Sequence, residues 1–273
     1  MKKNTFANST PRVVWYLGEE CVWKSPPESF EKELLPLFQT IYSQKALRSM
    51  EGYNPVIVGY DHASPRAVVH ITKLLADFKK VNPQCRIAME ILPPESYEWI
   101  TGFLRDEKEY NTHGTIHGKK PAEGLLASLL AYRSTLAKKH GAALLLWLLE
   151  NKFSVTSIEH PSVLSWISKD EHDHRFAEGK ADRRFGALWH QLRPFYTAIR
   201  RDIHGLGVLE KEQPDIICVG IYHAMKYDLL LKRDGKRSYY YVSEEFVKKQ
   251  LEWKLLLKMW KTSHEVYKKE PPE

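Results

Sequence analysis

Cysteine is scarce in this sequence, and its spacing gives it no shared role. The three cysteines, Cys21, Cys85 and Cys218, stand far apart in a chain of 273 residues. Their odd number and wide spacing exclude a disulfide framework and a CxxC metal knuckle. We expect Cys85 and Cys218 to be small core residues on apolar strands, and this cysteine usage predicts a reducing, cytoplasmic location.

Long apolar runs are missing as well. The most lipid-like stretch, residues 141–149, is too short to cross a bilayer, which takes ~20 apolar residues. A secretory signal requires an apolar segment after its first basic residues, and none follows Lys2 and Lys3. We therefore expect a soluble protein with no transmembrane segment. The sequence also has no Walker loop, GxGxxG or GxSxG, so nucleotide-binding and serine-hydrolase functions lack support.

The charge balance is basic without being concentrated. The formal net charge is +7, but the lysines and arginines are interleaved with acidic residues, so we do not expect nucleic acid as a partner. The densest basic tract is a helical pattern at 244–268. It fits a docked helix with a solvated lysine face, or a helix lying on a membrane or on nucleic acid. With 43% hydrophobic residues, we expect one domain over residues 1–273.

Strand-like and helical patterns alternate along the chain. The alternation predicts an α/β fold with a mostly parallel central sheet, helices on both faces, a long helical insertion and a C-terminal helix. Strand-like runs occupy residues 12–17, 55–62, 85–92, 153–158, 215–223 and 238–242. Helical patterns occupy residues 29–48, 65–78, 93–105, 121–151, 174–212, 224–231 and 244–268. Ser64 and Pro65 form a helix start signal, residues 106–120 read as a loop, and Asp234-Gly235 reads as a hairpin-like turn.

Two of the strand-like runs end in the same motif, Gly-x-x-His. The first ends in His62 and the second in His223, and each is followed by a helical pattern. In an open α/β sheet, strand ends that lead into helices line the crevice where ligands bind. The repeated motif therefore predicts that the two imidazoles share one site.

Other ionisable residues also follow apolar strands. Asp61 precedes His62, Glu90 lies within the apolar run at 87–92, and Glu159 follows the run at 153–158. A charge at the end of a buried strand must be paired, hydrated or bound to something. Histidines and carboxylates together supply metal sites and general acid–base sites. A structural alternative stands beside each: Glu159, for example, could cap a helix that starts near residue 161.

Several of these segments resemble one known superfamily. GYDH at 59–62 and AMEIL at 88–92 resemble the opening of the TraB, ChaN and erythromycin-esterase-like superfamily, in which a Gly-x-x-His strand end precedes a strand with a glutamate. Arg201-Asp202, followed by VGIYHA at 219–224, resembles its Arg-Asp helix and second Gly-x-x-His. Glu159 takes the place of an acidic residue at the end of a middle strand. The resemblance spans about residues 54–232.

The resemblance implies a hydrolase of an ester or peptide-like bond, with a His/Glu pocket that acts on a small-molecule or peptide substrate. It implies that His62 and His223 act as metal ligands, or as a base and an oxyanion partner. It implies that Glu90 binds a metal or activates water. Arg201 would anchor a substrate carboxylate or phosphate, or pair with Glu90. If the site uses a divalent metal ion, its implied ligands are His62, Glu90, Glu159 and His223, with Asp61 supporting them.

The alternative function is a non-catalytic ligand-binding or regulatory protein that keeps the pocket. The feature that favours it is the sequence after Glu90 and after His223, which departs from the superfamily pattern at both places. The sequence does not indicate the substrate, the metal or the oligomeric state.

Overall fold

Seven strands form one sheet in the part of the chain that the computed structural model describes. The described residues are 12–17, 20–22, 28–60, 64–90, 102, 105–106, 108–115, 118–120, 142–161, 183–231, 233–242 and 253–269. The strands lie in the order β2-β1-β7-β3-β6-β4-β5. Their bounds are β1 Arg12–Leu17, β2 Glu20–Val22, β3 Val56–Tyr60, β4 Arg86–Met89, β5 Ser154–Ser157, β6 Ile216–Gly220 and β7 Arg237–Val242. Only β1 and β2 pair antiparallel in this sheet, so the mostly parallel sheet that the sequence predicts is confirmed.

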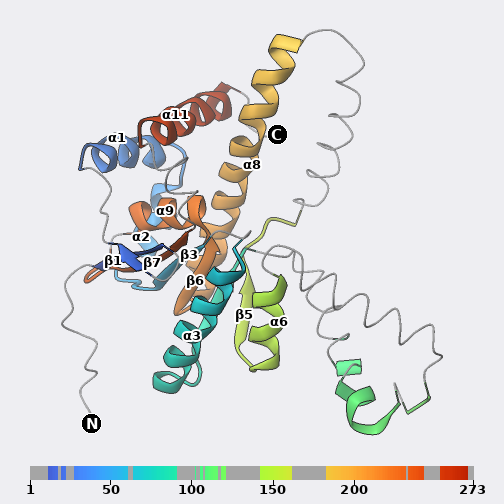
Figure 1. The fold of residues 1–273 in the computed structure, drawn as a ribbon. Helices are drawn as coiled ribbons and strands as arrows, with labels where there is room; N and C mark the ends of the chain where they lie inside the picture. The colour runs from blue at the N-terminus through green and yellow to red at the C-terminus, as the bar shows by residue number, and fades with distance from the viewer. Residues whose placement is uncertain are drawn as a thin grey trace.

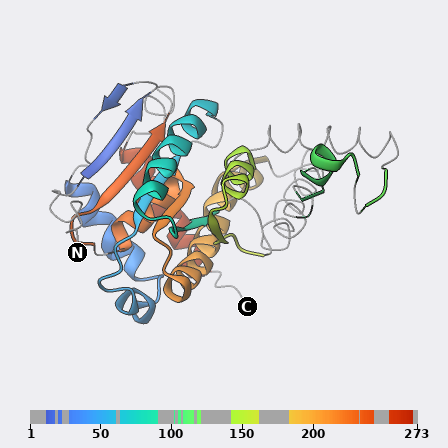
Figure 2. The same cartoon turned by 90° about the horizontal axis from the view of Figure 1, so that it is seen from below.

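Helices cover both faces of the sheet, as predicted. Figures 1 and 2 show α3 and α6 on one face and α1, α8, α9 and α11 on the other. The bounds of the helices are α1 Glu28–Gln39, α2 Gln44–Ser49, α3 Pro65–Val81, α6 Ala142–Glu150, α8 Arg183–Glu212, α9 Ile221–Leu230 and α11 Trp253–Lys269. Among the described residues, no helix has the length and apolar character needed to cross a membrane.

The two faces of the sheet bury two separate hydrophobic clusters. Ile57 of β3 belongs to the cluster under α1, α8, α9 and α11, while its neighbours Val56 and Val58 belong to the cluster under α3 and α6. This alternation is the two-residue period of a strand, and every residue of β3 is buried because both faces are covered. Cys85 and Cys218 lie in the second cluster, which confirms them as core residues.

Some predicted boundaries are confirmed and others are wrong. Ser64 does begin α3, since its hydroxyl oxygen accepts from the backbone N–H of Ala67. The predicted helix at 29–48 is two helices, because Ser43 caps a separate start for α2. Residues 108–113 of the predicted loop are helical. The predictions for residues 91–101, 121–141, 174–182 and 243–252 lie outside the described residues.

The turn at Asp234-Gly235 is present, but it does not close a hairpin. Gly235 has a φ of 60°, the left-handed conformation that glycine adopts easily. The strand that follows it, β7, pairs parallel with both β1 and β3. The turn therefore returns the chain from α9 to the sheet, because a parallel strand needs a crossover connection.

The glycine of the first Gly-x-x-His motif has a packing role. A Cβ atom at Gly59 would lie 2.7 Å from the Cβ of Ala224 on α9 and 2.7 Å from the Cδ1 of Tyr240 on β7. These distances are too short for any side chain larger than hydrogen. Gly59 therefore allows α9, the helix that carries His223, to lie directly on β3.

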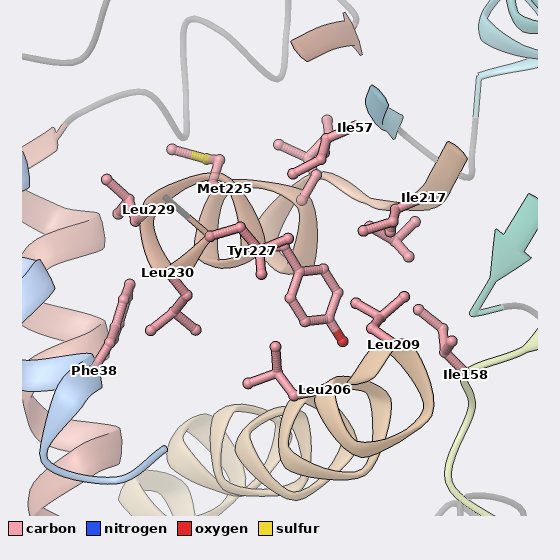
Figure 3. Packing of buried hydrophobic residues seen from close by; sticks show 14 of the residues in the cluster. Phe38, Ile57, Ile158, Leu206, Leu209, Ile217, Met225, Tyr227, Leu229 and Leu230 are labelled. Atoms are coloured by element: carbon pink, nitrogen blue, oxygen red, sulfur yellow. The ribbon is translucent and has the colours of Figure 1, made fainter. Parts of the chain in front are cut away.

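A second close approach joins α9 to α8. Figure 3 shows Tyr227 pointing from α9 toward α8, beside Leu206 and Leu209. Tyr227 is almost wholly buried, and its hydroxyl group occupies the space that a Cβ atom at Gly205 would fill. The absence of a side chain at Gly205 thus sets the distance between the two helices.

Two glycines of α8 give a matched test of this contact. Gly205→Ala should lower the free energy of unfolding by about 1–3 kcal/mol, because Tyr227 must move within a filled core. At Gly207, also in α8, an added Cβ meets no atom of the described structure within 4 Å. Gly207→Ala should therefore stabilise the protein by about 0.5–1 kcal/mol through helix propensity. Urea denaturation checks both values, and similar shifts in the two variants would contradict the contact.

Candidate functional site

Four charged or titratable side chains meet at one edge of the sheet. Glu90 directly follows β4, Glu159 lies two residues beyond β5, and His223 lies in the first turn of α9, which follows β6. These three strands are neighbours and run parallel, so their carboxyl ends share an edge. Arg201 reaches the same place from α8. In open α/β sheets this edge is where ligands bind.

Arg201 holds the two glutamates together. Its Nε donates to Oε1 of Glu159 at 2.7 Å, and its Nη2 donates to Oε2 of the same residue at 2.5 Å. The same Nη2 also donates to Oε1 of Glu90. Only 6% of Glu90 and 3% of Glu159 is exposed, and this guanidinium supplies a counter-charge to both buried carboxylates.

Burial and pairing act in opposite directions on these groups. Burial raises the pKa of Glu159 above its ordinary value, and the bonds from Arg201 reverse only part of that shift. Burial by itself lowers the pKa of Arg201, but the nearby charges of Glu90 and Glu159 raise it further than burial lowers it. Arg201 therefore stays a cation, while proton uptake at Glu159 is easier than at an exposed glutamate.

His223 is held between two carboxylates. Its Nδ1 forms a hydrogen bond with Oδ1 of Asp202, which is wholly buried on α8. Its Nε2 lies 3.2 Å from Oε1 of Glu90. A carboxylate bonded to one ring nitrogen fixes the orientation of an imidazole and leaves the other nitrogen for proton transfer. The Asp202–His223 pair has this form.

Asp202 has two further partners behind the imidazole. Its Oδ2 accepts from the Nζ of Lys226 at 2.6 Å and from the hydroxyl of Tyr42 at 3.2 Å. Burial alone would raise the pKa of Asp202, but the charges of His223 and Lys226 and their hydrogen bonds outweigh it and lower the pKa to about 2. Asp202 is therefore ionised throughout the neutral range.

Glu90 also stabilises the start of α9. Its Oε2 accepts from the backbone N–H of Gly220 at 2.8 Å, and Gly220 is the N-cap residue of α9, which has no side-chain cap of its own. A carboxylate is favoured at the positive end of a helix. One side chain thus caps α9, pairs with Arg201 and lies against the imidazole of His223.

The structure brings together four of the six predicted site residues. Glu90, Glu159, Arg201 and His223 form one connected network, and the alternative in which Arg201 pairs with Glu90 is the arrangement observed. The two others, Asp61 and His62, lie outside the described residues. Sequence reasoning gave no role in the site to Lys226, which follows His223 by three residues and so lies on the same side of α9.

The described residues do not by themselves form a metal site. Among them, no group of three or more His, Cys, Asp or Glu side chains is arranged to hold a metal ion. The guanidinium of Arg201 bridges the two glutamates, where a divalent ion would otherwise balance their charge. The predicted four-residue metal site includes His62, which lies outside the described residues, so it stays a prediction.

In comparisons with protein-family models, curated proteins and solved structures, nothing matches this chain. The resemblance to the TraB, ChaN and erythromycin-esterase-like superfamily therefore stays a prediction from the motifs.

Proposed function

We propose that the protein hydrolyses an ester or peptide-like bond, with His223 as the general base. The observation that carries the proposal is the Asp202–His223 pair, which lies at the carboxyl edge of a parallel sheet with its Nε2 turned toward Glu90. A buried carboxylate that orients an imidazole is a recurring element of hydrolytic sites on unrelated folds. The superfamily resemblance points to the same chemistry.

The geometry supports roles in hydrolysis for His223, Asp202 and Arg201. Nε2 of His223 would accept a proton from water as the water oxygen bonds to the carbonyl carbon of the substrate. It would then return that proton to the oxygen or nitrogen of the leaving group as the bond from this atom to the carbonyl carbon breaks. Asp202 would hold Nδ1–H and balance the imidazolium between these steps. The guanidinium of Arg201, partly exposed at the same edge, would place positive charge near the oxyanion.

The test is turnover of nitrophenyl esters and fluorogenic peptides at pH 7–8, with EDTA and, separately, with Mn²⁺ or Zn²⁺. His223→Gln should lower kcat/KM at least about a hundredfold, the typical contribution of a positioned general base. His70→Gln is the matched control. His70 lies on α3 and stacks on Tyr241, on the face of the sheet opposite to α8 and α9. This variant should keep full activity.

Two results would overturn the proposal. One is full activity in the His223→Gln variant when its circular dichroism spectrum shows that it is folded. The other is no turnover by the unmodified protein on either panel under any of the metal conditions.

The ligand-binding alternative has one specific observation in its favour. Both ring nitrogens of His223 already face carboxylate oxygens, so the network is satisfied internally. Binding of a nitrophenyl ester without its hydrolysis, measured by calorimetry and lost in His223→Gln, would support this alternative over the hydrolase.

A further inference from the structure

Two histidines outside the network lie against each other at the same edge of the sheet. His160 follows Glu159, and its backbone N–H donates to Oε1 of that residue at 2.9 Å. His204 lies on α8, three residues beyond Arg201 and thus on the same side of the helix. The two ring centroids are 5.1 Å apart and the ring planes make an angle of 62°. Both side chains are partly exposed.

The separation of the rings matches that of two ligands of one metal ion. With metal–nitrogen bonds of about 2.0–2.1 Å and a tetrahedral angle at the ion, two imidazole ligands have ring centres roughly 5 Å apart. The observed separation of the ring centroids, 5.1 Å, is close to this value. The rings come from different elements, the segment after β5 and the middle of α8, so the sheet and helix fix the spacing.

A positive charge lies near the two rings. The guanidinium of Arg200 is close enough to His160 to act on it electrostatically. That charge opposes a dication at the pair, so the expected affinity is moderate.

We propose that His160 and His204 bind one late first-row divalent ion, Zn²⁺ or Cu²⁺. These ions favour imidazole nitrogen among protein ligands. Among the described residues, these two imidazoles are the ligands that the protein supplies, since no third histidine, cysteine or carboxylate there completes a metal group with them. This site differs from the predicted set of His62, Glu90, Glu159 and His223, and it does not depend on the proposed hydrolysis.

The experiment is a Zn²⁺ titration of protein without an affinity tag, with a fluorescent chelator as competitor and the imidazole C–H signals followed by NMR. His160→Gln and His204→Gln should each weaken binding at least about tenfold, because two ligands make the site. The double variant should lose one equivalent of Zn²⁺. His70→Gln and His223→Gln should each keep that equivalent, and Cu²⁺ should bind the same pair more tightly.

The outcomes separate this proposal from the other site. Unchanged stoichiometry and affinity in the folded double variant would overturn it and leave the ring contact as ordinary packing. Loss of the equivalent in His223→Gln, with retention in the double variant, would also overturn it and assign the ion to the network residues. Either result leaves the hydrolase test unaffected, since that test measures turnover.

Discussion

Asp202→Ala should lower the free energy of unfolding by about 3–5 kcal/mol. The substitution leaves the ammonium group of Lys226, which is 1% exposed, buried without its closest counter-charge, and an uncompensated buried charge is strongly destabilising. It also removes the hydrogen-bond partner of His223 and of the Tyr42 hydroxyl. Urea denaturation at pH 7 measures the loss.

A double-mutant cycle with Lys226→Met isolates the ion pair. When both charges are absent, the buried ammonium no longer lacks a partner, so the loss in the double variant should be smaller than the sum of the two single losses by about 0.5–3 kcal/mol. Methionine suits the position because it retains the length of the side chain near the ring of Trp260. Additive losses would contradict a direct contribution of the pair to stability.

Arg201→Met should lower the free energy of unfolding by about 3–5 kcal/mol for a related reason. Here the buried charges left without a counter-charge are negative. It leaves Glu90 and Glu159 buried beside each other without the guanidinium that bridges them. An exposed ion pair of similar length supplies the control. The Nζ of Lys261 lies 2.6 Å from Oε2 of Glu33, and about half of each side chain is exposed. Lys261→Met should therefore lower the free energy of unfolding by less than about 1 kcal/mol.

The loss in Arg201→Met should shrink as the pH falls from 7 toward 5. Burial already raises the pKa of Glu159 in the intact protein, and removal of Arg201 raises it further. The folded variant then binds more protons than its unfolded chain above the ordinary glutamate pKa, so its stability falls as the pH rises. Urea midpoints at pH 7 and pH 5 check the direction. A loss that grows on acidification, or one no larger than that of Lys261→Met, would contradict this account.

The fold was the more predictable part of this molecule. Apolar runs such as residues 55–58 and 215–219 show directly as buried strands, and the Ser64-Pro65 start of α3 depends on neighbouring residues alone. The break between α1 and α2 was not predicted, because the apolar periodicity continues through Ser43. Helical spacing describes which residues face the core and does not show where a cap interrupts the helix.

The site was predictable in its members but less so in its connections. Glu90 and Glu159 were recognisable because carboxylates are unusual at the ends of apolar strand-like runs. The sequence did not decide whether Arg201 pairs with Glu90 or binds a substrate, so the ion pairs that join the two glutamates were not predicted. Lys226 was overlooked because a lysine three residues after His223 looks like an exposed helix residue until α8 is placed against α9.

One turn of α8 faces several neighbours at once. Arg201 contacts the segments after β4 and β5, Asp202 contacts α9, and Gly205 makes room for Tyr227. Adding or deleting a single residue within this turn would rotate everything beyond it by about 100°. Homologous chains should therefore vary in length before or after this turn and keep an unbroken count of residues through it.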